Sequence, residues 1–183
     1  MTTATTTAPS GTYALDLTHS RLGFTARHAM VTKVRGAFED FTGTASIDFD
    51  DPSRSAAEVT FQIASINTGQ KQRDEHLRTN DFFDATTYPT GHFVSTSVVG
   101  DSERVEMTGD LTLKGVTRPV TISWESTGTA KDPFGNTRAG FEGRATISRK
   151  DWGIEYNAAL ETGGVLIGDK IVLELDVSAV LAP

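Results

Sequence analysis

Side chains that could do chemistry gather in one passage of the chain, Gln70 to Pro89. This passage is also the one clearly helix-capable stretch in a sequence otherwise dominated by strand alternation. Asp74 and His76 stand two residues apart, so on a helix they lie on different faces and form no direct acid–imidazole pair. The passage therefore predicts a short helical lid whose groups act only with partners from other elements. Its acid, base, imidazole and aromatic groups are Arg73, Asp74, Glu75, His76, Phe82, Phe83 and Asp84.

Ordinary surface pairing is a competing interpretation of the same charges. Asp74 precedes Arg78 by four residues, and Lys71 precedes Glu75 by four. Such spacings give solvated helix pairs worth about 0.3 kcal/mol each. Leu77 is the only large apolar residue of the predicted helix, so burial of an apolar face does not explain it. We expect polar contacts to hold the helix against other elements.

Histidines are the only other residues that suggest a metal or catalytic centre. The four are His19, His28, His76 and His92, and none stands in an H-x-x-x-H or H-E-x-x-H arrangement. Convergence of the first three from separate elements stays open, but the sequence predicts no metal site. It also lacks a G-x-S-x-G elbow, a P-loop and a dinucleotide fingerprint. We interpret the chain as a protein without a cofactor and not as an enzyme.

Charge and composition exclude several classes of protein. The net charge of −7 lacks the clustered cations that coat nucleic acid. The absence of cysteine removes disulfides and thiolate chemistry. No run of 18 apolar residues predicts a membrane-spanning helix. The first residues lack the basic and apolar regions of a secretory signal, so we expect a cytoplasmic protein with a disordered tail over residues 1–11. Residues 12–183 are expected to form a single domain.

Segments with a two-residue period fill the rest of the chain, and we count roughly eight main strands. The segments are 13–17, 21–28, 38–49, 56–66, 91–99, 103–114, 116–130, 137–149 and 169–181. Turn signals such as Asp51-Pro52 and Lys114-Gly115 separate them, which suits hairpin connections in an antiparallel sheet. One parity is apolar in nearly every segment and the other is polar, so one face of one sheet is apolar throughout.

A long antiparallel sheet with one apolar face either closes into a barrel or folds over as a sandwich. With only one good helix available to plug a barrel, we expect the all-β chain to close around an internal cavity. Phe82 and Phe83 of the lid either plug that interior or pack in a core. The residues predicted to line the cavity are Phe24, Phe61, Ile63, Phe82, Phe83, Leu111, Ile122, Trp124, Phe141, Ile147 and Leu175.

Several short motifs occur in an order that resembles the YceI-like family. They are Tyr13-x-Leu15-Asp16-x-x-His19-Ser20, Phe24-x-x-x-His28, Gly36-x-Phe38-x-x-Phe41-x-Gly43, Ser65-Ile66-x-Thr68, Arg73-Asp74-x-His76-Leu77, Asp81-Phe82-Phe83-Asp84, Tyr88-Pro89, Gly109-x-Leu111-Thr112-x-Lys114-Gly115-Val116-Thr117 and Arg149-x-Asp151-x-Gly153-Ile154. The resemblance implies an extended, eight-stranded, lipocalin-like antiparallel barrel that is usually a homodimer. It also implies a cavity for isoprenoid chains such as polyprenyl phosphates or quinones. Many relatives are periplasmic and carry a leader, which this sequence does not show.

Four residues are candidates for contact with the head group of such a lipid: His28, Asp74, His76 and Arg149. His28 and Arg149 share the parity of inward residues near strand ends. His28 could instead be a buried histidine satisfied by the backbone, and Arg149 could pair with Asp151 in place of a phosphate. The leading hypothesis is non-catalytic carriage or storage of an isoprenoid lipid. An enzyme for a small lipophilic substrate and a stress-related structural or partner-binding protein are the alternatives.

Overall fold

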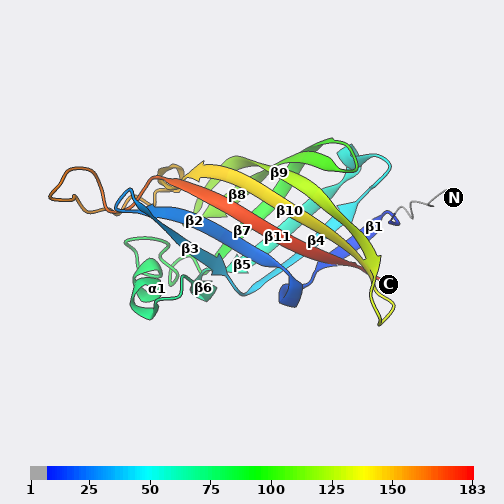
Figure 1. Ribbon diagram of the computed structural model, residues 1–183, viewed down its shortest axis with the longest axis horizontal. Helices are drawn as coiled ribbons and strands as arrows, with labels where there is room; N and C mark the ends of the chain where they lie inside the picture. Colours follow the sequence, from blue (N-terminus) through cyan, green and yellow to red (C-terminus); the bar gives the residue numbers. More distant parts are fainter. Residues whose placement is uncertain (1–7) are drawn as a thin grey trace.

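The strands of the protein form one antiparallel sheet that closes on itself. The computed structural model describes residues 8–183 (Figure 1). Its order, β1-β4-β5-β7-β8-β9-β10-β11, is closed by pairing of β11 with β1. The strands are β1 (Gly11–Leu15), β2 (Arg21–His28), β3 (Thr32–Phe38), β4 (Phe41–Ile47), β5 (Ala56–Gln62), β6 (Ile66–Asn67), β7 (Thr90–Gly100), β8 (Arg104–Leu113), β9 (Val116–Lys131), β10 (Thr137–Ser148) and β11 (Lys170–Leu181).

Three of the strand positions in the barrel wall are each made of two strands placed end to end: β1 with β2, β3 with β4, and β5 with β6. β11 pairs with β2 through Val172–Asp176 and with β1 through Ala179–Leu181, so β1 and β2 follow one another along one edge. In the same way β3 precedes β4, and β6 follows β5. Ser65, between β5 and β6, holds the chain between β3 and β4, because its hydroxyl accepts the backbone N–H groups of Glu39 and Asp40 at 3.0 Å. The wall therefore has eight strand positions, and the predicted eight-stranded antiparallel barrel is confirmed.

The prediction missed one strand. No strand was expected before residue 38 in this part of the chain, yet β3 covers Thr32–Phe38 and pairs with β2. Its inward series includes Gly36, which interrupts the apolar alternation. A Cβ atom on Gly36 would come closer than 3 Å to the ring of Phe24 on the neighbouring strand. The glycine that hides the strand in the sequence thus makes room for an aromatic side chain.

The same relationship recurs around the inner wall. The rings of Phe61, Phe93 and Trp124 lie over glycines on adjacent strands, and a Cβ there would come closer than 3 Å to each ring. Those glycines are Gly91, Gly109 and Gly143. Rings placed over glycine lie along the wall, whereas a Cβ beneath them would push them toward the axis. This pairing lets large aromatic residues line the barrel without filling it.

The lid contains less helix than its sequence suggests. Within Gln70 to Pro89 only α1 (Lys71–Leu77) is helical, and the Gln70 side chain caps it by accepting the N–H of Arg73 at 2.6 Å. Turns follow, and the Lys114 ammonium group donates to the carbonyl of Asn80 at 3.0 Å. α1 lies at the end of the barrel near β3 and β6 (Figure 1). No helix of the described residues is long and apolar enough to cross a membrane.

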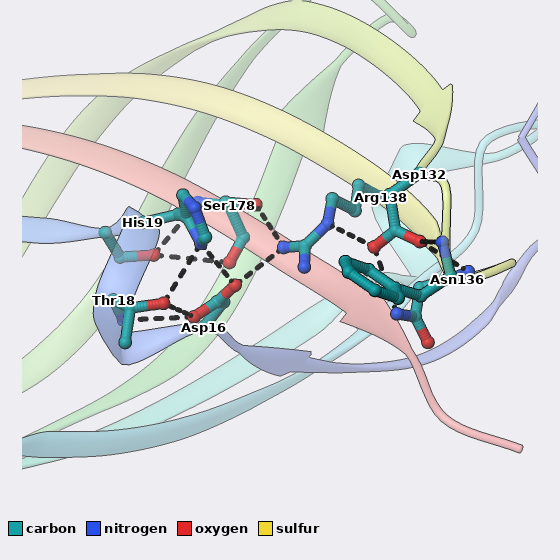
Figure 2. A network of polar contacts seen from close by, with 9 residues as sticks. Asp16, Thr18, His19, Asp132, Asn136, Arg138 and Ser178 are labelled. Carbon is teal, nitrogen blue, oxygen red and sulfur yellow. Dashed lines mark hydrogen bonds and ion pairs between the residues drawn. The ribbon is translucent and has the colours of Figure 1, made fainter.

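A polar network fastens the opposite end, where β1 meets the β9–β10 hairpin. Figure 2 shows Arg138 between two carboxylates. Its Nη1 donates to Asp16 at 2.6 Å and its Nε to Asp132 at 2.9 Å. The bonds from Arg138 and Thr18 hold the pKa of Asp16 far below its usual range. Bonds led by the side chain of Asn136 lower the pKa of Asp132 to about 2.

The expected domain boundary falls inside the first strand. β1 begins at Gly11, and the Tyr13 hydroxyl donates to the carbonyl of Pro9 at 2.7 Å. Most of the tail predicted for residues 1–11 lies outside the described residues, which begin at residue 8.

Candidate functional site

A long apolar cavity runs inside the barrel. Residues from Ile171 to Ala179 of β11 contribute to its lining, a stretch of roughly 26 Å at the usual rise of a strand. The volume inside it that the centre of a water molecule can occupy is about 320 Å³. Among residues 8–183, the ionisable side chains on the lining are Asp48, Asp101 and Arg149 alone. The interior is therefore an apolar space that side chains do not fill completely.

The inward parity of the strands places most of the predicted lining residues on this cavity. Phe24, Phe61, Phe82, Phe83, Leu111, Ile122, Trp124, Phe141, Ile147 and Leu175 all line it. Ile63 does not, because η3 (Ile63–Ser65) turns it into the adjacent core, where it is 1% exposed.

Trp152 lines the cavity but was not predicted. It lies in η4 (Arg149–Trp152), a 3-10 turn after β10 that has no two-residue period to reveal its direction. Its indole N–H donates to the backbone carbonyl of Leu111 at 2.8 Å. The ring is thereby fixed against β8 with its polar atom satisfied.

The mouth of the cavity lies at the end of the barrel away from α1. Four lining residues are exposed, and all belong to the β4–β5 and β7–β8 connections or their edges: Ser46, Ala56, Asp101 and Ser102. Asp48 lines the same opening. The Asp101 carboxylate accepts the backbone N–H groups of Glu103 and Arg104 at 2.9 Å, and these bonds lower its pKa. The mouth thus carries negative charge.

Arg149 lies at the other end and is 5% exposed. Its guanidinium donates to four backbone carbonyls and not to the Asp151 carboxylate, which was the alternative partner. Its Nη1 donates to Ile154 at 2.8 Å and to Tyr156 at 3.0 Å; Nε donates to Gly168 at 3.0 Å and Nη2 to Ile167 at 3.4 Å. Burial lowers its pKa, opposed by the charges of Asp169 and Glu155. Arg149 therefore connects the beginning of the segment between η4 and β11, at Ile154 and Tyr156, to its end at Ile167 and Gly168.

His28 lies outside the cavity lining. It is exposed at the end of β2, where its backbone pairs with Ile167. Ala29 and Met30 follow with φ of 50° and 61°, and this left-handed turn ends the alternation on which the inward prediction depended.

Asp74 is buried between α1 and the segment that follows β6, and it does not line the cavity. Its Oδ1 accepts the N–H of Thr68 at 2.9 Å and the Thr68 hydroxyl at 2.5 Å. The expected surface pair with Arg78 is wrong, because Arg78 donates to the carbonyls of Ala64 and Ile66 instead. The other predicted pair, Lys71 with Glu75, is present at 3.8 Å.

His76 is half-buried and connects the lid to the segment held by Arg149. Its Nε2 lies 2.8 Å from Asp81 Oδ2. Its ring meets those of Phe82 and Tyr156 edge to face, each at 5.0 Å between centroids. Because Tyr156 also accepts a bond from Arg149, these two predicted residues are linked through it. His28 and Asp74 do not join them.

Histidines of the described residues do not form a metal centre. His19 pairs with Asp16 at 2.8 Å and His92 with Glu58 at 2.9 Å, each on the surface of a different element. Within residues 8–183, no group of three or more histidine, cysteine or acidic side chains is placed to hold a metal ion.

The sequence of the chain matches a known protein family over most of its length. The YceI-like domain matches residues 13–179. The chain belongs to the YceI-like family. Protein YceI of Shigella flexneri is 41% identical over 137 residues, which cover 75% of this chain and 72% of that protein. A UPF0312 protein of Photorhabdus laumondii is 40% identical over 147 residues, covering 79% and 77%.

Solved structures share the fold of this YceI-like chain. The YceI protein of Campylobacter jejuni superposes with a TM-score of 0.72 at 34% identity, covering 86% of this chain and 90% of that one. BcnA of Burkholderia cenocepacia gives a TM-score of 0.79 at 24% identity, covering 90% and 98%. A polyisoprenoid binding domain from Saccharophagus degradans gives 0.71 at 19% identity, covering 93% and 98%. At 24% and 19% identity, the similarity to these last two structures is a similarity of fold alone.

Proposed function

We propose that this protein binds a long-chain isoprenoid lipid in the barrel and carries or stores it without changing it chemically. The observation that carries the proposal is the long, apolar and unfilled cavity, whose lining has only three ionisable side chains in the described part of the chain. The name of the similar domain from Saccharophagus degradans, a polyisoprenoid binding domain, agrees with this class of ligand. Polyprenyl phosphates and polyprenyl quinones are the two ligand types that we consider.

The hydrophobic energy of such a ligand cannot be its net affinity. Burial at about 0.8 kcal/mol per methylene would give tens of kcal/mol from water, which exceeds the ceiling of known complexes. A lipid bilayer already shelters the chain, so its transfer from bilayer to cavity is nearly neutral in the hydrophobic contribution. Selectivity must then come from the shape of the chain and from polar groups near the ends of the cavity.

Carriage without chemistry is supported by the arrangement of the lining charges. Arg149 already donates to four carbonyls, and Asp48 and Asp101 lie at the opposite end. General acid–base catalysis needs titratable groups within hydrogen-bond reach of one reacting atom. The two ends of a long barrel do not supply such a group.

Uptake of isoprenoids from mixed micelles tests the proposal, with tryptophan fluorescence as the readout because Trp124 and Trp152 line the cavity. We expect affinity to rise with chain length until the cavity is full. Ile122→Asn, which adds an amide to the lining, should weaken uptake. Thr121→Asn is the matched control, because Thr121 is exposed on the outer face of the same strand. Equal affinity for short and long chains, or equal effects of the two substitutions, would contradict binding in the barrel.

A homodimer is part of the same proposal and is supported by the family resemblance. The chain has a mass of 19.7 kDa. Light scattering coupled to size exclusion should give twice that mass. A single-chain mass at all concentrations would refute the dimer and leave the lipid proposal standing.

A further inference from the structure

Trp124 has an unsatisfied polar atom in the cavity wall. Its indole Nε1 is the one buried side-chain nitrogen or oxygen within residues 8–183 that has no hydrogen-bond partner. The other tryptophan, Trp152, donates its N–H to Leu111. Leaving a buried donor without an acceptor is unfavourable, because the group has lost its hydrogen bond to water. An acceptor supplied by a ligand would replace that bond.

The position of Trp124 is close to the mouth. Trp124 lies opposite Val105 in the ladder between β9 and β8. Val105 is the second residue of β8, directly after the turn that connects β7 to β8. Asp101 and Ser102 of that hairpin are exposed lining residues of the mouth. Trp124 is therefore placed where the polar end of an inserted lipid would lie, while the rest of the cavity continues toward Arg149.

The orientation of the ring leaves the N–H free of the neighbouring strand. The benzo carbons Cε3 and Cζ3 lie over Gly143 of β10. Nε1 is on the opposite side of the indole, so the N–H points away from β10.

Charge at the mouth restricts what that ligand end can be. Asp48 and Asp101 line the opening, whereas no lysine, arginine or histidine of the part that the structure describes does. Arg54 and Arg104 are nearby, but Arg54 lies 3.9 Å from Asp48 and Arg104 pairs with Glu125 at 3.1 Å. A phosphate at the mouth would meet the like charges of Asp48 and Asp101. An uncharged group with an acceptor oxygen would not.

We infer that Trp124 Nε1 donates a hydrogen bond to an uncharged, oxygen-bearing head group held just inside the mouth, with the isoprenoid tail directed toward Arg149. This inference rests on the proposed function and assigns the head group to the end opposite the candidates His28, Asp74, His76 and Arg149. Trp124 acts as a determinant of specificity: it selects lipids with a carbonyl-type acceptor over hydrocarbon or phosphate of equal chain length.

Three probes with the same polyprenyl chain test it: a benzoquinone, a phosphate and the plain hydrocarbon, all presented in the same mixed micelles. Binding to the full chain is compared with Trp124→Phe and with the matched variant Trp152→Phe. We expect Trp124→Phe to weaken binding of the quinone about tenfold more than binding of the hydrocarbon. Trp152→Phe should change both affinities by the same factor, since its N–H is already engaged. The wild type should bind the quinone more tightly than the phosphate.

An unchanged quinone-to-hydrocarbon ratio in Trp124→Phe, or tighter binding of the phosphate, would overturn the inference. If Trp124→Phe fails to fold, the ¹⁵N-labelled wild type gives a second test. Its Trp124 indole resonance should move downfield with the quinone and not with the hydrocarbon; equal shifts would contradict the hydrogen bond. Absence of binding by all three probes would refute the proposed function itself.

Discussion

The benzo edge of Trp124 lies over Gly143, and a Cβ atom on residue 143 would fall 2.6 Å from Cε3 and Cζ3. These two residues face one another in the ladder between β9 and β10. The glycine thus determines where the largest aromatic side chain of this part of the wall can lie. Together with three similar phenylalanine–glycine pairs, it explains how a wall rich in aromatic residues encloses an open interior.

Gly143→Ala should therefore displace the Trp124 ring toward the cavity axis. We expect a loss of about 1–3 kcal/mol in the free energy of unfolding, typical of an overpacked site, together with weaker lipid uptake. Urea denaturation and the fluorescence titration measure the two effects. The double variant Gly143→Ala, Trp124→Leu should recover much of the lost stability. Strictly additive losses would show that the ring and the glycine are not coupled.

Arg149→Met should loosen the segment between η4 and β11. The substitution removes the guanidinium donor from four backbone carbonyls, of which only that of Ile167 keeps another donor, the Asn157 amide, so we expect a loss of about 2–4 kcal/mol. Hydrogen exchange should rise first in residues 154–168. Arg144→Met, on the exposed face of β10, is the matched control and should have little effect. Equal stability and equal hydrogen exchange in the two variants would contradict the role of Arg149 in holding residues 154–168 in place.

Asp74→Ala should reduce stability without a specific effect on lipid binding, because Asp74 holds Thr68 and does not line the cavity. We expect about 1–3 kcal/mol of destabilisation. Thr68→Val, which removes the partner hydroxyl, should behave similarly. A lipid affinity that falls while the unfolding curve stays unchanged would instead assign Asp74 to the head group.

The network around Arg138 predicts acid sensitivity. Asp16 and Asp132 have pKa values lowered in the folded state, the latter to about 2, whereas an unfolded aspartate titrates near ~3.9. Their stabilisation is therefore complete above about pH 4 and is lost as the pH falls toward 2. In Asp16→Asn and Asp132→Asn the free energy of unfolding should depend less on pH in this window. Asp110→Asn, an exposed carboxylate on β8, should retain the wild-type slope. Curves parallel to the wild type for all three variants would contradict the prediction.

Strand alternation predicted an antiparallel sheet with one apolar face, because inward and outward residues differ in polarity along nearly every strand. It left the choice between barrel and sandwich open, and the family resemblance favoured the eight-stranded barrel. Alternation failed where the backbone leaves that period. His28 was predicted inward, but the left-handed residues Ala29 and Met30 end β2 there. β3 was missed because Gly36 occupies an inward position that Phe24 covers.

The polar contacts of the site were harder to predict for a physical reason. Arg149 is inward, as its parity indicated, but its partners are backbone carbonyls, which every residue has and no side-chain pattern marks. Asp74 and Arg78 have the spacing of a surface pair, yet each finds a partner outside the helix. Trp124 was expected on the cavity, but the unsatisfied state of its N–H depends on the neighbours that the fold brings near it.

Identification of the lipid that accompanies the protein tests the central claim most directly. Freshly purified protein is extracted with organic solvent, and the extract is analysed by mass spectrometry. We predict a long-chain isoprenoid in amounts that follow the protein, and its loss in Ile122→Asn but not in Thr121→Asn. An extract without such a lipid, combined with no uptake of added polyprenyl quinone or polyprenyl phosphate, would contradict the account.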